Sequence, residues 1–334
     1  MLLIETADVY RRRNFEGKFM KPITASVLLG CALLSGACGP SGRDGGGGGG
    51  DDTQDGPDAG SGTPGTVQKC SKMDIVFVVD DSGSMSEEQS NLATNFPMFA
   101  TVLQNYVNEE GQHIDFRVAV TTTGKNFTTT FTGFPLPPMV EHGPDGVFLN
   151  NCGVAQRWLD SSTPNLGTTL GCRANVGTTG TSYEMPLLMT KNALDKHGNM
   201  ENAGFIRPDA LLGVVMLTDE DDSSSSFDMI SIDPTNPAAA NPPIDFQPAD
   251  LISYLDTLKG NRTRWATGVI AGETSCSSGF GSAAEATRLK QFVQMTNANG
   301  SQQAVFSSIC AGNLTMALSD VLAKFQSACG GIIL

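Results

Sequence analysis

The chain has 334 residues, of which 40% are hydrophobic and 17% charged, and it contains 38 glycines and 17 prolines. This length suffices for one large domain or two small ones, and the apolar content can supply a core. The formal net charge is −14 and no basic stripe is present to neutralise phosphates, so nucleic-acid binding is not expected.

An apolar segment of small residues occupies positions 22–37. It is shorter than the roughly 20 apolar residues that span a bilayer, and with Lys21 before it the segment fits a secretory signal. It ends in LSGAC, which resembles a lipobox except for a serine where leucine is usual. We therefore predict a signal region over 1–38, with Met20 as an alternative start and Cys38 as the lipidated residue.

A lipid on Cys38 implies an exported lipoprotein of the bacterial cell envelope, in contact with the membrane through this anchor only. In the Gram-negative lipoproteins that this segment resembles, an aspartate directly after the lipidated cysteine retains the protein in the inner membrane. Here that position is Gly39. We therefore expect a location in the outer membrane or at the cell surface. The alternatives are a plain cleaved signal, or lipidation at Cys31.

The remaining chain divides into a linker and a domain. Residues 39–69 are rich in Gly and Asp without apolar periodicity, which is typical of a flexible linker. We predict a domain over 70–329 and a short tail over 330–334. An even number of cysteines in an exported chain indicates disulfides, but the sequence alone does not choose among the many pairings. We predict the pairs Cys152–Cys172, Cys276–Cys310 and Cys70–Cys329, the last joining the two ends of the domain.

Strands and helices alternate along the predicted domain. The predicted strands are 74–79, 114–121, 211–217, 265–271 and 304–309, with an edge strand near 127–134. The predicted helices are 86–107, with a capping box at 86–89, then 184–196, 249–259, 283–296 and 313–327. Residues 124–180 and 221–248 are predicted to be long loops. Continuously apolar strands that alternate with helices predict a doubly wound α/β fold, with a mostly parallel sheet flanked by helices.

Oxygen-bearing side chains lie at the predicted carboxyl edge of this sheet, where such folds bind ligands. Carboxylate and hydroxyl oxygens suit a hard divalent cation, and we expect Mg²⁺, with Ca²⁺ or Mn²⁺ as alternatives. A simple turn with N-cap serines would explain one serine, but not two aspartates and a threonine at the same edge. The candidate ligands are Asp80, Ser82 and Ser84 after the first strand, Asp219 after a later strand, and Thr181 before a helix.

The segment DIVFVVDDSGSM resembles the first strand and D-x-S-x-S motif of von Willebrand factor A domains. In that family the motif belongs to a metal-ion-dependent adhesion site (MIDAS). The resemblance covers about residues 70–329 and implies that all five candidates are metal ligands. The threonine is the least fixed of them, because Thr178, Thr179 and Ser182 are neighbours of Thr181.

The resemblance also implies a function in protein binding. In the family an acidic side chain of the partner completes the coordination of the metal, so we expect a metal-dependent adhesion module with an unknown acidic protein partner. The sequence departs from the family at Glu220-Asp221-Asp222, where a glycine often follows the aspartate. These acids could form a second cation site or a solvated acidic loop, and charge runs favour the loop.

Two other functions are compatible with parts of the sequence. A structural module would use the metal for stability alone. A subtilisin-like serine hydrolase is suggested by the Gly-Thr-Ser turn at Ser182, but such an enzyme needs a histidine base. The three histidines, His113, His142 and His197, lack the required sequence context, so we expect no enzyme activity.

Overall fold

The computed structural model describes residues 70–133, 135–233, 242–279, 281–312 and 314–331. The predicted signal region, the lipidation site at Cys38 and the predicted linker lie outside these residues. No helix within the described part of the chain is both long enough and apolar enough to cross a membrane.

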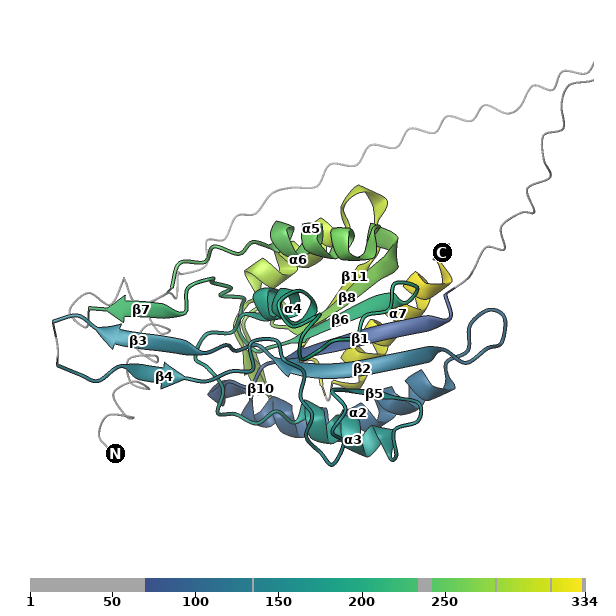
Figure 1. The fold of residues 1–334 in the computed structure, drawn as a ribbon, viewed down its shortest axis with the longest axis horizontal. Coiled ribbons are helices and arrows are strands. Elements are labelled where there is room, and N and C mark those ends of the chain that lie inside the picture. Colours follow the sequence, from purple (N-terminus) through teal and green to yellow (C-terminus); the bar gives the residue numbers. More distant parts are fainter. Residues whose placement is uncertain (1–69, 134, 234–241, 280, 313, 332–334) are drawn as a thin grey trace, which may run out of the picture. The chain divides into compact units, whose positions relative to one another are not determined.

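A six-stranded sheet occupies the centre of the domain (Figure 1). Its order is β11-β8-β6-β1-β2-β5, and neighbouring strands are parallel except for β2 and the edge strand β5. β6 and β8 are buried along their whole length, which explains their continuously apolar sequences. The strands are β1 Lys72–Val79, β2 Asp115–Thr122, β5 Trp158–Asp160, β6 Leu211–Leu217, β8 Trp265–Ala271 and β11 Ala304–Ser308.

Helices cover both faces of this sheet (Figure 1). One core lies under α2, α3 and α7, where Phe77 of β1 packs edge-on against Phe96 and Phe99 of α2. The second core lies under α4, α5 and α6 and contains the fully buried Trp265. The helices are α2 Ser86–Asn105, α3 Leu166–Ala174, α4 Pro186–Leu194, α5 Pro248–Lys259, α6 Thr287–Thr296 and α7 Thr315–Gly330. The predicted doubly wound α/β fold is confirmed.

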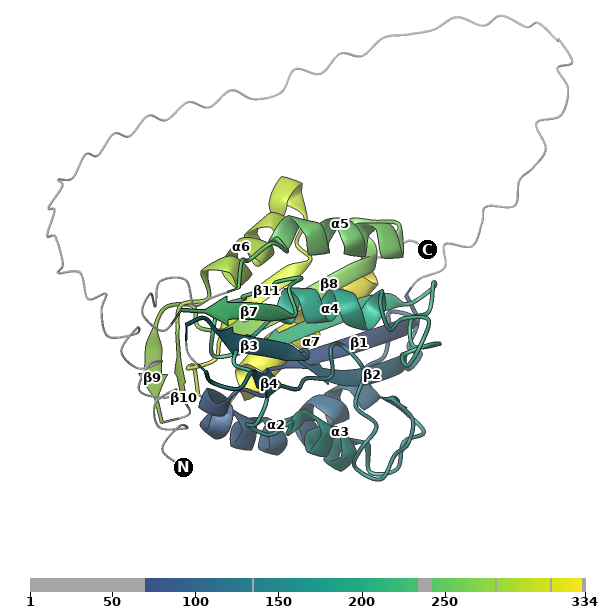
Figure 2. The same cartoon turned by 60° about the vertical axis from the view of Figure 1, so that its left-hand side comes forward.

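Two smaller sheets lie near the carboxyl ends of the central strands. The first has the order β4-β3-β7 and extends beyond β1 and β2 (Figure 1). The second is an antiparallel pair, β9 and β10, beside the N-terminal end of α2 (Figure 2). Their bounds are β3 Phe127–Phe131, β4 Met139–Glu141, β7 Met229–Ile232, β9 Cys276–Ser278 and β10 Gly281–Ala283.

The structure corrects two local predictions. The predicted loop 124–180 contains α3, whose glycines allow close packing on α2, since a Cβ on Gly171 would lie 3.1 Å from the Ala93 carbonyl oxygen. The predicted capping box is wrong, because no side chain caps α2 and the Ser86 hydroxyl donates to its neighbour Glu87 at 2.8 Å. Tertiary packing fixes both segments more strongly than their local sequence does.

The three predicted disulfides are confirmed. The Cα–Cα distances are 5.2 Å for Cys70–Cys329, 6.1 Å for Cys152–Cys172 and 6.3 Å for Cys276–Cys310. Cys70–Cys329 joins the segment before β1 to the end of α7 and links residues 259 positions apart in the sequence. Cys152–Cys172 links residues only 20 positions apart.

This difference in loop length predicts unequal contributions to stability. In the chain-entropy description, loss of Cys70–Cys329 in a double Cys→Ser variant should lower the free energy of unfolding by about 5 kcal/mol, and loss of Cys152–Cys172 by about 3 kcal/mol. Denaturant unfolding of both variants measures the two losses. A larger loss for Cys152–Cys172 would show that local strain or packing, not chain entropy, decides the order.

Candidate metal centre

Asp80 and Thr218 leave the central sheet side by side, because Val79 of β1 pairs with Leu217 of β6. The Asp80 N–H donates to the Leu217 carbonyl at 2.9 Å, one residue beyond the strand. The Thr218 hydroxyl donates to Asp80 Oδ2 at 2.6 Å, and Asp80 is fully buried. Sequence reasoning missed Thr218, although its position directly before Asp219 in the motif was a usable signal.

A chain of hydrogen bonds connects four of the five predicted ligands. The Ser82 N–H donates to Asp80 Oδ1 at 2.8 Å, and the hydroxyl oxygens of Ser82 and Ser84 lie 3.0 Å apart. The Ser84 hydroxyl donates to Asp219 Oδ1 at 3.2 Å. Asp80, Ser82 and Asp219 are buried while Ser84 is exposed, so the cluster reaches the surface at Ser84.

Gln89 of α2 joins the two loops that flank this cluster. Its side-chain N–H donates to the Asp80 carbonyl at 2.7 Å, and its side-chain oxygen accepts from the Val176 N–H at 3.0 Å. Gln89, which the sequence predicted as part of a capping box, therefore holds the Asp80 backbone in position instead.

Thr181 lies on the second of these loops and is buried. Its hydroxyl donates to the Tyr183 carbonyl at 3.3 Å and packs against Gly124, where an added Cβ would lie 2.4 Å from the hydroxyl oxygen. The preceding Gly180 donates its N–H to the Asp81 carbonyl at 2.7 Å. The loop thus contacts the first motif through Gly180, and the role of Thr181 as a ligand stays a prediction.

Further carboxyl groups, which sequence reasoning did not assign, surround the cluster. Glu88 of α2 is 1% exposed and Glu184, just before α4, is 2% exposed. Both side-chain oxygens of Glu88, Oε1 of Glu184 and Oδ1 of Asp81 are buried without a hydrogen-bond partner among the described residues. A buried anionic oxygen without a partner is costly, so each of these groups needs a proton or a cation nearby.

Buried acids elsewhere in the domain have an arginine. Asp74 accepts hydrogen bonds from the N–H and Nε of Arg207 at 2.6 and 2.8 Å, and Asp222 lies 3.3 Å from the guanidinium of Arg288. The candidate centre differs in this respect. Within the described ranges, no lysine or arginine forms an ion pair with Asp80, Asp81, Glu88, Glu184 or Asp219.

Burial and mutual repulsion raise the pKa values of these acids. Burial, followed by the charges of Asp80 and Glu220, raises the pKa of Asp219 to about 8. Burial, followed by the charge of Asp80, raises the pKa of Asp81 to about 6. Burial, followed by the charges of Asp80 and Glu220, also raises the pKa of Glu184. The fold therefore makes ionisation of these acids unfavourable, and no lysine or arginine of the described residues pairs with them to offset this.

The donor set fits a hard divalent cation. Asp80 and Asp219 offer carboxylates, Ser82 and Ser84 offer hydroxyls, and the neighbouring acids have unsatisfied oxygens that a cation would stabilise. No group of three or more His, Cys, Asp or Glu side chains arranged to hold a metal occurs in the described part of the chain. The candidate centre differs from such a group, because two of the four side-chain oxygens in its hydrogen-bond chain are serine hydroxyls.

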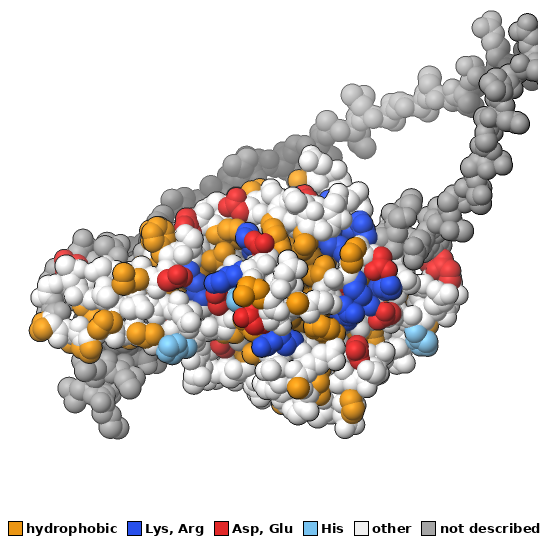
Figure 3. All heavy atoms as spheres, viewed as in Figure 1, with side chains coloured by type: hydrophobic (Ala, Val, Ile, Leu, Met, Phe, Trp, Pro, Cys, Tyr) orange, Lys and Arg blue, Asp and Glu red, His pale blue; other side chains and the backbone are white. Residues whose placement is uncertain are grey.

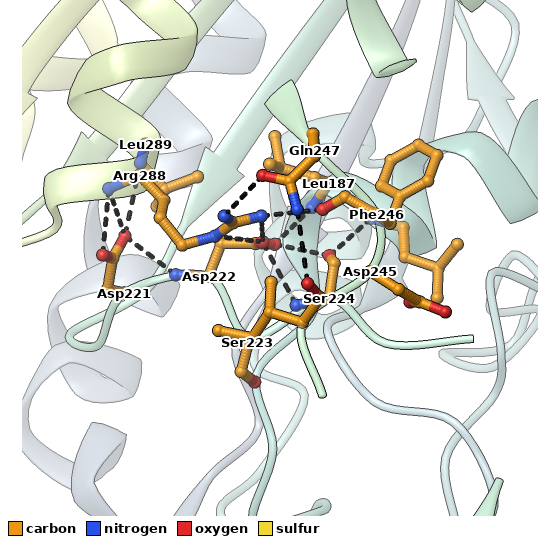
Figure 4. A network of polar contacts seen from close by, with 12 residues as sticks. Leu187, Asp221, Asp222, Ser223, Ser224, Asp245, Phe246, Gln247, Arg288 and Leu289 are labelled. Atoms are coloured by element: carbon orange, nitrogen blue, oxygen red, sulfur yellow. Dashed lines mark hydrogen bonds and ion pairs between the residues drawn. The ribbon is translucent and has the colours of Figure 1, made fainter. Parts of the chain in front are cut away.

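The favoured interpretation of Asp221 and Asp222 as a solvated loop is wrong (Figure 4). Asp221 accepts from the N–H groups of Arg288 and Leu289 at 2.9 and 3.2 Å, in the first turn of α6. Asp222 is buried and accepts from the Leu187 N–H at 3.1 Å, in the first turn of α4. The first N–H groups of a helix have no partner within the helix, so these two acids cap two helices.

Ser182 contacts an acid instead of the base that the hydrolase alternative requires. Its N–H donates to Glu141 Oε1 at 3.1 Å, and its hydroxyl donates to the same oxygen. The ring Nδ1 of His142 lies 3.2 Å from Asn126 Oδ1. Ser182 therefore lacks the Ser–His pair of that mechanism among the described residues.

Comparison with known proteins finds distant structural neighbours. No protein-family model and no curated protein matches the chain. The chain is similar to the solved structure of proximal thread matrix protein 1 from the mussel byssus, with 12% identity, 77% of this chain and 49% of that chain covered, and a TM-score of 0.40. The form of that protein with a zinc-occupied MIDAS motif gives 12% identity, 77% and 48% coverage, and a TM-score of 0.38.

A second neighbour is the pilus adhesin SpaC from Lactobacillus rhamnosus GG. The identity is 10%, 78% of this chain and 31% of the adhesin are covered, and the TM-score is 0.38. The chain thus spans about half the length of the mussel protein and about a third of the adhesin.

The raised pKa values predict how pH changes the stability of the chelator-treated protein. A carboxyl group with a higher pKa in the folded than in the unfolded state binds more protons when folded, so stability falls as pH rises. With Asp81 near 6 and Asp219 near 8, both above the unfolded value of 3.8, thermal unfolding with EDTA should occur at lower temperature at pH 8 than at pH 6.

Two variants test the origin of this pH dependence. Asp219→Asn cannot ionise and should flatten the fall between pH 6 and 8, whereas Asp320→Asn, at an exposed position of α7, should leave it unchanged. A chelated wild-type protein that became more stable from pH 6 to 8 would contradict the uncompensated acidic cluster.

Proposed function

We propose that this domain is a divalent-cation-dependent protein-binding module. The observation that carries the proposal is the hydrogen-bonded cluster of Asp80, Ser82, Ser84 and Asp219 at the carboxyl edge of the sheet, amid buried acids without a cationic partner. The resemblance of DIVFVVDDSGSM to the MIDAS segment of von Willebrand factor A domains supports the same interpretation.

The residues of the cluster have different roles in the proposed binding. Asp80 and Asp219 supply charge for a cation, with Mg²⁺ expected and Ca²⁺ or Mn²⁺ as alternatives, while Ser82 and Ser84 supply neutral oxygens and Thr181 completes the predicted set. Thr218 and Gln89 hold Asp80 in place through its carboxylate and its carbonyl. A bound divalent cation supplies a positively charged coordination position for an oxygen of the partner.

The surface beside the cluster favours a protein partner. Ser84 is exposed next to the buried ligands, so an outside carboxylate can approach there. Hydrophobic side chains are visible at the end of the molecule formed by the β4-β3-β7 sheet (Figure 3). In this sheet, Met139 and Val140 of β4 and Met229 of β7 are 47%, 55% and 59% exposed. Exposed apolar side chains beside a polar site are typical of interaction surfaces.

The proposed cellular setting is the outer membrane or surface of a bacterial envelope. Its support is the lipobox-like sequence that ends at Cys38, together with three disulfides, which form in oxidising compartments. In this setting the predicted linker would hold the domain away from the membrane.

A metal-stabilised structural module is the second candidate. The observation in its favour is the burial of Glu88, Glu184 and Asp81, because a cation that relieves their repulsion would stabilise the fold with or without a partner. Both functions predict that a cation raises the temperature of unfolding. Metal-dependent capture of a partner occurs only in the first.

Replacement of the central aspartate tests the proposed function. Asp80→Ala should weaken Mn²⁺ binding, measured by calorimetry, by at least about 100-fold, since loss of outer partners alone weakens metal sites by about 10–100-fold. In pull-downs from envelope extract, the wild-type full chain should retain a partner with Mg²⁺ and release it with EDTA, and Asp80→Ala should retain none.

The control for this experiment is Asp320→Ala, which removes an exposed carboxylate of α7. Circular dichroism confirms that each variant is folded. Equal Mn²⁺ affinity and equal partner capture by Asp80→Ala and wild type would refute the proposal, and metal binding without any metal-dependent capture would favour the structural module.

A further inference from the structure

The segment between β8 and α6 reaches Asp219 from outside the central sheet. The Ala284 N–H, directly after β10, donates to the Asp219 carbonyl at 2.8 Å. The carboxylate of the same Asp219 accepts from the Ser84 hydroxyl at 3.2 Å. Asp80 is held by the neighbouring strand and by α2, whereas the backbone of Asp219 is held by this later segment of the chain.

The base of the segment is closed against the central sheet. The Gly272 carbonyl, directly after β8, accepts from the Ala286 N–H, directly before α6, at 2.8 Å. An added Cβ on Gly272 would overlap the Ala284 carbonyl oxygen, so the two stretches of backbone pass in close contact. The end of β8 therefore helps to set the position of Ala284.

The Cys276–Cys310 disulfide fixes the outer part of the segment. Cys310 follows β11, an edge strand of the central sheet, and Cys276 is the first residue of β9. In the antiparallel pair of β9 and β10, Cys276 lies opposite Ala283, the residue before Ala284. The covalent link to the central sheet is therefore directly beside the N–H group that holds Asp219.

The β9–β10 pair also contacts α2 beside its N-terminal end (Figure 2). Gly281 of β10 has a φ of +136°, and an added Cβ would overlap Oε1 of the buried Glu88. Only glycine fits this contact without a shift of β10 or of the glutamate. Glu88 precedes Gln89, which donates to the Asp80 carbonyl. The pair thus connects the helix that holds Asp80 with the backbone of Asp219.

We propose that the β9–β10 pair, fastened by Cys276–Cys310, is the positioning element that sets the affinity of the candidate centre for a divalent cation. The inference rests on the proposed function and deepens it, because it assigns the control of Asp219 to a part of the chain outside the motif. A displaced pair releases Asp219 while the central sheet still holds Asp80. Cation affinity then falls although the fold persists, since a preorganised ligand set has become a loose one.

Two glycine variants of the full chain test this inference. Gly281→Ala should displace β10 from α2, whereas the new Cβ of Gly279→Ala, close by in the sequence, meets no atom within 4 Å. In Mn²⁺ titrations by calorimetry, Gly281→Ala should bind about 10–100-fold more weakly than wild type, which is the loss that removal of outer partners causes at metal sites. Gly279→Ala should bind as wild type does.

Hydrogen exchange of the chelator-treated chain gives a readout that needs no metal. The Ala284 N–H loses its acceptor when β10 moves, and strain at a left-handed position weakens the contact. Peptides that cover residues 281–286 should therefore exchange roughly 10-fold faster in Gly281→Ala than in wild type or Gly279→Ala. Peptides of β6 and β8 should exchange as in wild type, which shows that the domain remains folded.

Two disulfide variants separate position from stability. Cys276→Ser combined with Cys310→Ser should weaken Mn²⁺ binding as Gly281→Ala does. Cys70→Ser combined with Cys329→Ser opens a link between residues 259 positions apart instead of 34, so it should cost more stability. Cys70 precedes β1, at the end of the strand opposite Asp80, so this variant should keep the wild-type affinity.

The outcomes separate the inference from the proposed function. Wild-type affinity in both Gly281→Ala and the Cys276/Cys310 variant overturns the inference, and so does an equal loss of affinity in the Cys70/Cys329 variant. If partner capture still requires metal and Asp80 in either case, the proposed function stands alone. A wild-type chain that binds no Mn²⁺ overturns both.

Discussion

The parallel pairing of β1 with β6 is the constraint on which the candidate centre depends. With Val79 opposite Leu217, the next residues, Asp80 and Thr218, must emerge together at the carboxyl edge. Both strands are buried by helices on the two faces, and from Ile75 of β1 and along all of β6 their side chains are apolar until the strands end. The hydroxyl and carboxyl groups of the candidate centre therefore lie beyond this edge, in the loops after β1 and β6.

The placement of arginines distinguishes this edge from the rest of the domain. Arg207 compensates Asp74 near the opposite end of β1, and Arg288 compensates Asp222 next to the helix termini. The domain thus contains the usual solution for a buried acid and does not use it for the acids around Asp80. Folding of the domain offsets the free-energy cost of burying these carboxylates, so their oxygens are positioned before any cation binds. Cys276–Cys310 contributes to this order, because it fixes β9 and hence β10, which lies against Glu88 through Gly281.

The sequence predicted those parts of the fold and site that depend on local pattern. β6 and β8 follow from continuous apolar runs, and Asp80, Ser82 and Ser84 follow from a short motif in its strand context. The parts that it did not predict depend on contacts between distant segments. Ala284 meets Asp219, and Asp222 caps α4, only after the sheet has formed. A run of three acids therefore looks uniform in the sequence, although Asp221 and Asp222 cap helices and Glu220 faces the cluster.

The balance of charge connects the proposed cation to partner binding. The serine hydroxyls add oxygens to the connected cluster without adding charge, so Asp80 and Asp219 are its two carboxylates, and an outside carboxylate can be attracted to the cation. On the proposed function, the buried acids around Asp80 destabilise the metal-free domain and favour binding of a cation, so capture of an acidic partner depends on the cation concentration.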